Sequence, residues 1–241
     1  MRRSGKDKGR QFWGIFWVLI LFPPFLANAS MAQEKGILWV DCFSNGVDQK
    51  GIPVGWILEK TPGSSSKIAI GGEKENHFLH LLSMGDSFGL RKEISFDIRK
   101  YPYLSWRWKV SKLPQGGDLR KRETDDQAGQ IYVLFPKWPT TINTRSVGYI
   151  WDSLAPVGLS GTSTAYKKMK YIVLQSGAGE LNRWVSETRN VYEDYQKLFK
   201  GNPPTVGALL LYINSQHTKS SAECFYSNIF FSANPPQDLR K

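Results

Sequence analysis

The chain has 241 residues and a formal net charge of +11, from 32 lysines and arginines against 21 acids. This length suits one β-sandwich or two small domains. The two cysteines are too few for a zinc site built from cysteines alone.

The first 29 residues have the three parts of a secretory signal peptide. A basic head, MRRSGKDKGR, precedes an apolar run over residues 12–26 and a small-x-small sequence that ends at Ala29. The run is short and interrupted by two prolines, which disfavours a membrane-spanning helix. No cysteine lies at the expected cleavage site, so a lipoprotein is not indicated. We expect cleavage after Ala29 and a periplasmic or secreted mature protein; an uncleaved anchor is the alternative.

The remaining charge indicates the available partners. Removal of the leader, with five basic residues and one acid, lowers the net charge from +11 to about +7. Basic proteins often bind nucleic acid, but an exported one seldom meets it. We therefore expect no nucleic-acid partner. A glycan or another anionic envelope component is the alternative to a charge that serves solubility only.

Short apolar or alternating runs recur along the mature chain between turns rich in Gly, Pro, Ser, Asn and Asp. This spacing is typical of a sandwich or barrel. We predict strands at 37–43, 56–59, 67–70, 78–82, 88–98, 104–110, 130–135, 147–151, 170–175, 184–188, 206–213 and 223–231. The segments 206–213 and 225–231 are apolar on both faces, so we expect them to be central strands.

Residues 104–110 alternate most clearly. Trp106 and Trp108 share one face of this strand with apolar neighbours, while Arg107 lies on the other face. Aromatic side chains supply much of the packing in a sandwich, so we expect both tryptophans in the core. Trp138 lies in a proline-framed loop and is the ring that we expect to be exposed.

One helix is expected near 190–200. Asn190 followed by Glu193 resembles a capping box, and apolar residues then recur at helical spacing. Gly201 and the prolines after it would end the helix.

The prediction is thus an all-β fold: a single antiparallel β-sandwich, jelly-roll-like, with one short helix. The signal peptide covers 1–29, a short disordered segment 30–36, the sandwich 37–232 and a disordered tail 233–241. Cys42 and Cys224 lie near the two ends of the sandwich. A disulfide between them would stabilise the fold by about 4–5 kcal/mol in theory; two free buried thiols are the alternative.

Several segments together resemble a bacterial exported family catalogued as domain of unknown function 3047, over roughly residues 39–231. They are 101–108, Asp125-Asp126 with 130–135, 173–177, 184–191, Asp194-Tyr195 and 225–231. The family name implies no activity. The layout also resembles the galactose-binding-like jelly rolls among carbohydrate-binding modules, an analogy of fold only.

One stretch departs from the family pattern. Where the family has an Asp-x-Asp-Asn-Thr-like turn, this chain has residues 214–218 as Asn-Ser-Gln-His-Thr. Hard cations prefer carboxylate oxygens, so we predict no metal there and no cofactor. Asn and Thr bonding to their own backbone would make the segment a turn and nothing more.

Asp125 and Asp126 form the most prominent acidic pair. They could bind a cation or a sugar hydroxyl, or one could act as a general acid or base. The structural alternative is that an acid before a strand holds backbone N–H groups or pairs with Arg107. Glu187 could join Asp126 in a two-carboxylate glycosidase site. An ion pair of Glu187 with Arg189 or a neighbouring strand is the simpler interpretation.

Other catalytic patterns are weak. The histidines are His77, His80 and His217, and no serine is framed as Gly-x-Ser-x-Gly. No zinc spacing, phosphate-binding loop or dinucleotide motif is present. The first hypothesis is therefore a non-catalytic sandwich that binds a carbohydrate or other envelope ligand. The alternatives are an envelope glycan hydrolase using Asp126 and Glu187, or a structural or docking protein. The candidate ligand-binding residues are Arg107, Asp125, Asp126, Trp138, Glu187, Arg189 and Asp194.

Overall fold

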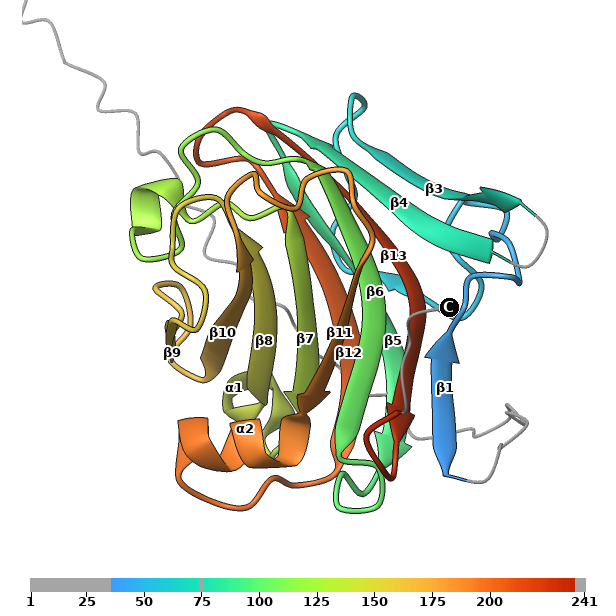
Figure 1. Cartoon of the computed structure of the whole chain (residues 1–241), viewed down its shortest axis with the longest axis vertical. Coiled ribbons are helices and arrows are strands. Elements are labelled where there is room, and N and C mark those ends of the chain that lie inside the picture. Colours follow the sequence, from blue (N-terminus) through green and yellow to red (C-terminus); the bar gives the residue numbers. More distant parts are fainter. Residues whose placement is uncertain (1–35, 74–75, 237–241) are drawn as a thin grey trace, which may run out of the picture.

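Alternating burial along the strands builds two packed sheets in the computed structural model, which describes residues 36–73 and 76–236 (Figure 1). Each half-buried strand points one side chain in two into the space between the sheets. The predicted signal peptide lies outside the described residues, as do most of the predicted N-terminal segment and the last residues of the tail.

The six-stranded sheet has the order β11-β6-β13-β4-β3, and β1 pairs separately with β13. Every pair in it is antiparallel. Its strands are β1 (Ile37–Asp41), β3 (Lys67–Glu73), β4 (Asn76–Met84), β6 (Tyr103–Lys112), β11 (Val185–Asn190) and β13 (Ser221–Ser232).

The seven-stranded sheet has the order β2-β5-β12-β7-β8-β10-β9. Its pairs are antiparallel except for β8 with β10, which run parallel. Its strands are β2 (Ile57–Leu58), β5 (Ser87–Phe96), β7 (Gly129–Phe135), β8 (Arg145–Asp152), β9 (Ser160–Thr162), β10 (Met169–Ser176) and β12 (Val206–Asn214). All twelve predicted strands are therefore confirmed with small changes of boundary, and β9 is an addition. The fold is the predicted jelly-roll-like β-sandwich.

Large aromatic side chains fill the space between the sheets. Trp106 and Trp108 are fully buried, as predicted, and their ring centroids lie 5.4 Å apart. From the opposite sheet, Tyr149 packs on Trp106 at 5.4 Å and Trp151 packs on Trp108 at 5.6 Å. Such contacts bury large apolar areas and give the sandwich most of its driving force. The expected central strands are also confirmed, because β12 lies between β5 and β7 and β13 between β6 and β4.

The predicted helix is α2 (Val191–Phe199), which lies at one end of the sandwich with the short α1 (Thr140–Asn143) (Figure 1). The Asn190 side chain accepts a hydrogen bond from the Glu193 N–H at 3.1 Å, which confirms the capping box. The C-cap residue is Lys200, with φ of 54°, and not Gly201 as predicted. A 3₁₀ turn, η1 (Arg122–Thr124), precedes β7.

The two cysteines are free, so the candidate disulfide does not form and the alternative of two free thiols is the one observed, with Cys224 buried and Cys42 partly buried. Cys42 follows β1, which pairs with the far end of β13 through Asp41 and Ile229. Cys224 lies five residues before Ile229 on the same strand. At about 3.3 Å per residue, this separation is far beyond the reach of a disulfide. Burial strongly raises the pKa of the Cys224 thiol, which makes it a core residue and not a reactive group.

Among the described residues, no helix is long and apolar enough to cross a membrane.

Candidate functional site

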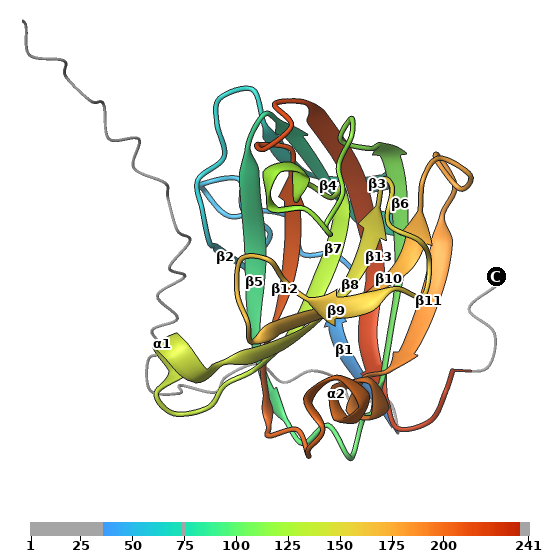
Figure 2. The same cartoon turned by 90° about the vertical axis from the view of Figure 1, so that its left-hand side faces the viewer.

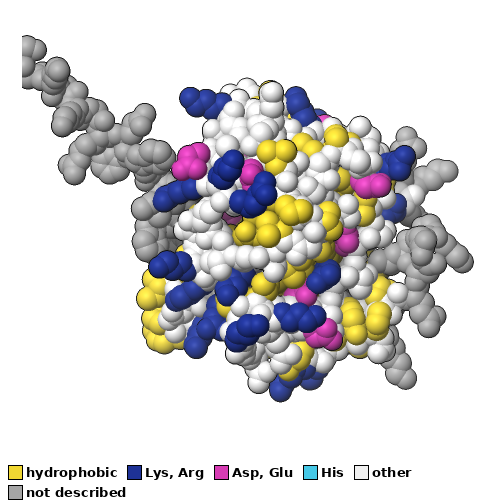
Figure 3. All heavy atoms as spheres, turned by 60° about the vertical axis from the view of Figure 1, so that its left-hand side comes forward, with side chains coloured by type: hydrophobic (Ala, Val, Ile, Leu, Met, Phe, Trp, Pro, Cys, Tyr) yellow, Lys and Arg dark blue, Asp and Glu magenta, His cyan; other side chains and the backbone are white. Residues whose placement is uncertain are grey.

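The outer side of the seven-stranded sheet carries three tyrosines from three different strands. Tyr132 is on β7, Tyr171 on β10 and Tyr212 on β12, and all three belong to a second apolar cluster outside the main core. Figure 2 looks onto this side of the sheet. In Figure 3, hydrophobic side chains gather in the middle of the visible surface with Lys and Arg around them. We call Tyr132, Tyr171 and Tyr212 the tyrosine floor.

The strand register lines these residues up in two rows across the sheet, about 7 Å apart because same-face residues alternate along each strand. The first row is Arg91, Leu210, Tyr132, Gly148, Tyr171 and Gly161. The second row is Gly89, Tyr212, Gln130, Ile150 and Val173.

A glycine lies directly opposite each tyrosine on the neighbouring strand. A Cβ on Gly148 would lie 2.3 Å from the Tyr132 ring, one on Gly89 would lie 2.7 Å from Tyr212, and one on Gly161 would lie 2.7 Å from Tyr171. Each ring therefore leans over its paired glycine, close to the sheet surface, because no side chain is there to hold it away. The sheet thereby gains a low aromatic surface where upright side chains would otherwise stand.

Asp125 lies beside this surface. Its carboxylate accepts hydrogen bonds from Gln127 Nε2 at 2.9 Å and from the Thr164 hydroxyl at 2.9 Å. Burial raises the pKa of Asp125, although these two hydrogen bonds favour the charged form. Burial also raises the pKa of Tyr212 to about 12, and the nearby charge of Asp125 adds to that effect. The same charge contributes to the raised pKa of Tyr132 and Tyr171, so one carboxylate lies near all three rings.

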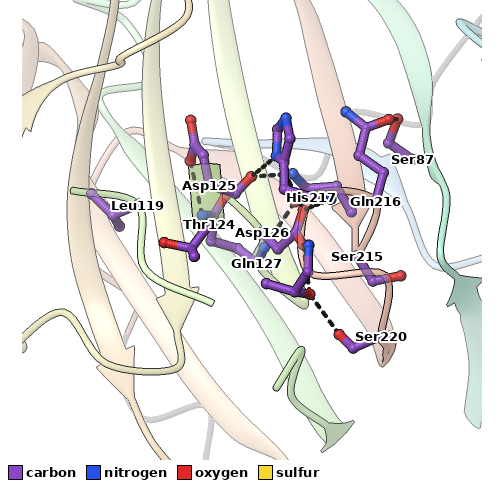
Figure 4. Close-up of polar contacts among 12 residues, drawn as sticks. Ser87, Leu119, Thr124, Asp125, Asp126, Gln127, Ser215, Gln216, His217 and Ser220 are labelled. Atoms are coloured by element: carbon purple, nitrogen blue, oxygen red, sulfur yellow. Dashed lines mark hydrogen bonds and ion pairs between the residues drawn. The ribbon is translucent and has the colours of Figure 1, made fainter. Parts of the chain in front are cut away.

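Asp126, although next in sequence, has a different position. Its fully buried carboxylate accepts hydrogen bonds from the Thr218 N–H and hydroxyl, each at 2.7 Å, and from the His217 N–H at 3.2 Å (Figure 4). These donors belong to the turn between β12 and β13, which joins the two sheets. Asp126 therefore has the structural role that the sequence offered as the alternative to ligand binding. Its carboxylate holds backbone N–H groups and does not pair with Arg107.

That turn contains residues 214–218, for which the sequence predicts no metal. Asn214 accepts hydrogen bonds from the Gln127 N–H and from Gln130 Nε2, each at 2.8 Å. Since Asp126 binds the other end of the turn, its polar groups are largely satisfied within the protein. Among residues 36–73 and 76–236, no cluster of three or more metal-ligating side chains is found.

Asp152 and Asp118 hold the loops that border the floor. Buried Asp152 accepts hydrogen bonds from the N–H groups of Leu119 at 3.1 Å, Leu154 at 2.8 Å and Ala155 at 2.7 Å. It thus ties the loop before β7 to the loop after β8. Asp118 binds Arg120 through two hydrogen bonds of 2.7 and 2.9 Å, and the hydrogen bonding of Arg120 lowers the pKa of Asp118.

The first row of outward-facing residues begins at Arg91 on β5, and this end of the row is charged. Arg91 is nearly buried and forms ion pairs with Glu59 and Glu93, the latter at 2.7 Å. Since both acids are partly accessible, this end of the row offers carboxylate oxygens to solvent. The row thus runs from a charged end to an aromatic one.

The other predicted site residues do not join this site. Arg107 lies on the outer side of the opposite sheet, with its guanidinium carbon 5.5 Å from the Trp184 ring centroid. Trp138 is 85% exposed, as expected, but follows the far end of β7. The seven residues of β7 span about 20 Å between it and Asp125.

Glu187, Arg189 and Asp194 lie at the edge of the sandwich between β10 and β11. Glu187 accepts a hydrogen bond from Gln175 at 2.8 Å, and burial raises its pKa. Arg189 pairs with Asp194 at 2.7 Å, and Asp194 also accepts from the Tyr149 hydroxyl at 2.9 Å. The expected ion pair of Glu187 with Arg189 is not the one that forms, because the first turn of α2 brings Asp194 to Arg189.

Asp126 and Glu187 therefore share no partner. One is bound to the β12–β13 turn and the other to β10. Sequence reasoning missed the tyrosine floor altogether. The signal present in the sequence was an outward-facing tyrosine on each of three strands, with a glycine at the outward-facing position of the adjacent strand. Reading that signal requires the register between strands that are distant in sequence.

These features define a two-sheet β-sandwich of jelly-roll type with an aromatic outer face. The chain belongs to the family described as "Protein of unknown function (DUF3047)", whose pattern matches residues 55–230. No curated protein matches the sequence.

Solved structures give distant matches. A family 11 carbohydrate-binding module of a cellulosomal cellulase from Clostridium thermocellum aligns with 10% identity and a TM-score of 0.44, over 85% of this chain and 99% of the module. The same type of module in complex with a β-1,3-1,4-mixed-linked tetrasaccharide aligns with 11% identity and a TM-score of 0.41, over 83% of this chain and 97% of the module. The xyloglucanase domain of a Sinorhizobium fredii effector aligns with 11% identity and a TM-score of 0.40, over 73% of this chain and 90% of that domain. At TM-scores below 0.5, these proteins indicate no ligand for this chain.

Proposed function

We propose that the protein is a non-catalytic glycan-binding protein of the bacterial envelope, and that the glycan lies across the tyrosine floor. The observation that carries this proposal is the alignment of Tyr132, Tyr171 and Tyr212 over paired glycines on one sheet face. Sugar rings have flat C–H faces that stack on aromatic rings lying parallel to a surface. Tyr171 and Tyr212 are half-buried, so part of each side chain remains available for contact, whereas Tyr132 is 6% exposed and contributes mainly to the packing of the same sheet face.

Polar groups around the floor suit sugar hydroxyls. Asp125 supplies carboxylate oxygens at one margin, and Glu93 does so at the other end of the first row. Few polar groups placed around an apolar surface are the usual composition of a ligand site. The buried Asp152 fixes the bordering loops, so the floor is largely preformed and binding orders little of the chain.

The hydrolase alternative receives no support from these positions. A glycosidase needs two carboxyl groups on either side of one glycosidic bond. Asp126 is fully buried under a turn, and Glu187 lies at the edge between β10 and β11. Export of the mature protein remains part of the proposal and rests on the leader-like first 29 residues.

A thermal-shift screen against neutral and acidic polysaccharides tests the proposal, since a ligand that binds only the folded protein raises its melting temperature. Tyr171→Ala and Tyr212→Ala are expected to weaken binding of the best ligand about tenfold or more, as loss of a central aromatic contact does. Trp138→Ala, an exposed aromatic at the other end of β7, is the matched control and should bind normally.

Two results would contradict the proposal. The first is a broad panel in which no glycan shifts the melting temperature. The second is binding that Trp138→Ala abolishes and both tyrosine variants retain, which would move the ligand to the loop after β7.

A further inference from the structure

The outer side of the six-stranded sheet carries a second aromatic surface, on the face of the molecule opposite to the tyrosine floor. Phe78 is on β4, Phe225 on β13, and Trp184 immediately precedes β11. Their neighbours Cys224, Tyr226, Trp106 and Trp108 point into the core, so alternation turns Phe225, Arg107 and Lys109 outward. We call Phe78, Trp184, Phe225, Arg107 and Lys109 the cationic platform.

The three rings of the platform contact one another. Phe78 lies 5.9 Å from Trp184 and 5.6 Å from Phe225, and Trp184 lies 6.5 Å from Phe225, between ring centroids. Phe78 also leans over Gly71 of the adjacent strand, where a Cβ would lie 2.5 Å from the ring. All three rings are half-buried on the outer sheet face. They form a contiguous aromatic surface with part of each side chain accessible.

Two cations lie over these rings. Lys109 Nζ is 4.2 Å from the Phe225 centroid and 5.4 Å from that of Trp184, and the Arg107 guanidinium carbon is 5.5 Å from Trp184. Their spacing of two residues on one strand separates them by about 7 Å. The ring faces attract the cations and hold them at the surface of the platform.

Neither cation has a carboxylate partner among residues 36–73 and 76–236. The Nε of Arg107 is buried without a hydrogen-bond partner. The neighbouring acid Glu223 is bound to His80 at 2.7 Å and to the Ser111 hydroxyl. The buried Nε is out of reach of a ligand, so a planar anion such as a carboxylate would bind the terminal N–H groups of the guanidinium.

From these observations we propose that the cationic platform binds an acidic polysaccharide built from carboxylated sugars. The Phe225 ring is already covered by the His80 ring, stacked at 4.5 Å, and by Lys109. The C–H face of a uronic acid residue would therefore stack on Trp184, and its carboxylate would pair with Arg107 or Lys109. The net charge of about +7 that is expected after removal of the leader increases the local concentration of such a polyanion. Most of the described aliphatic side chains that are highly exposed belong to other elements, at residues 47, 54, 57, 142, 154 and 157. Met84 is on the outer side of this sheet, at the end of β4, six residues from Phe78. Few aliphatic side chains are thus available at this face for insertion into a lipid surface.

The test is isothermal titration with a short oligogalacturonate, and with the same oligosaccharide fully methyl-esterified as the uncharged control. We expect the charged form alone to bind, and its affinity to fall as salt is raised, because surface charges are screened. The double variant R107Q/K109Q should lose about tenfold or more in affinity, from the loss of charged hydrogen bonds. The double variant K121Q/K167Q removes the same charge from exposed positions elsewhere and should bind normally.

The tyrosine floor provides an internal check, because Tyr212→Ala should leave oligogalacturonate binding unchanged. The proposal fails if the charged form does not bind, if the esterified form binds equally, or if added salt has no effect on the unaltered protein. Equal losses in the two double variants would show only a general effect of charge and would also overturn it. Binding of single-stranded DNA that R107Q/K109Q abolishes, without any binding of oligogalacturonate, would reassign the platform to nucleic acid.

Discussion

On both outer faces of the sandwich an aromatic ring lies over a cross-strand glycine, but the charged groups beside the rings differ. On the seven-stranded sheet, Tyr132 leans over Gly148, and on the six-stranded sheet Phe78 leans over Gly71. In both cases the ring and the glycine are cross-strand partners. The carboxylate of Asp125 lies beside the tyrosines, on a face that also carries Lys and Arg (Figure 3), whereas the platform has Arg107 and Lys109 directly over its rings. Strand register alone can thus produce a flat aromatic surface, and the charges placed beside it decide which ligands it suits.

The faces also differ in how rigidly they are held. Tyr132 is 6% exposed and is packed under loops that Asp152 fixes. Phe78 is half-buried and contacts other surface rings. The tyrosine floor is therefore an extension of the packed interior, while the platform consists of side chains that can move into solvent.

The largest loss of stability is expected from a substitution at the β12–β13 turn, where the two sheets are joined. Asp126→Ala removes three hydrogen bonds to the β12–β13 turn and leaves buried donors unsatisfied. We expect the free energy of unfolding to fall by about 3 kcal/mol in urea denaturation. Asp125→Asn is the control, since it keeps the shape of a side chain that is only half-buried, and should cost about 1 kcal/mol or less. Equal losses for the two variants would contradict the separate roles of these acids.

A smaller effect separates the two faces. Gly148→Ala forces a Cβ against the Tyr132 ring, which is buried and has little room to move, so we expect a loss of about 2 kcal/mol and weaker glycan binding. Gly71→Ala should cost about 1 kcal/mol or less, because Phe78 can swing toward solvent. A Cβ on Gly179 meets nothing within 4 Å, so Gly179→Ala serves as the control. If Gly71→Ala proves the more damaging variant, the platform is the rigid face and our comparison is reversed.

The smallest effect concerns pH. Burial raises the pKa of Asp125, so the folded protein binds the proton of this carboxyl group more tightly than the unfolded chain does. The resulting stability is fully present below the unfolded pKa and is lost as the pH rises through the raised folded pKa. The difference in unfolding free energy between the protein and Asp125→Asn, measured against pH, should show this decrease above the usual range for aspartate. A difference that grows with pH would mean that hydrogen bonding to the charged form outweighs burial.

The sequence predicted the fold well because its signals are local. Alternation over 104–110 identified a half-buried strand with Trp106 and Trp108 in the core, and Asn190 with Glu193 identified the start of α2. Each signal lies within a few residues and follows from the period of a strand or a helix turn. The short strand β9 was not predicted, because three residues are too few to show an alternating pattern.

The candidate site depended on relations between distant segments. Asp125 and Asp126 are adjacent in sequence, yet only the position of the β12–β13 turn decides that one is buried beneath it while the other lies beside the tyrosines. The pairing of Tyr212 with Gly89 joins strands more than a hundred residues apart in the chain. Cys42 directly follows β1 and Cys224 lies on β13, the strand that pairs with β1, but the register places the two cysteines too far apart for a bond.

By itself, the sequence determined the strand pattern, the core tryptophans, the cap of α2 and the exposure of Trp138. The tertiary structure alone decided which tyrosines meet which glycines, which acid is buried and which cations remain without partners. The physical reason is that side-chain period is a property of each strand, whereas register between strands is set by packing across the whole sandwich.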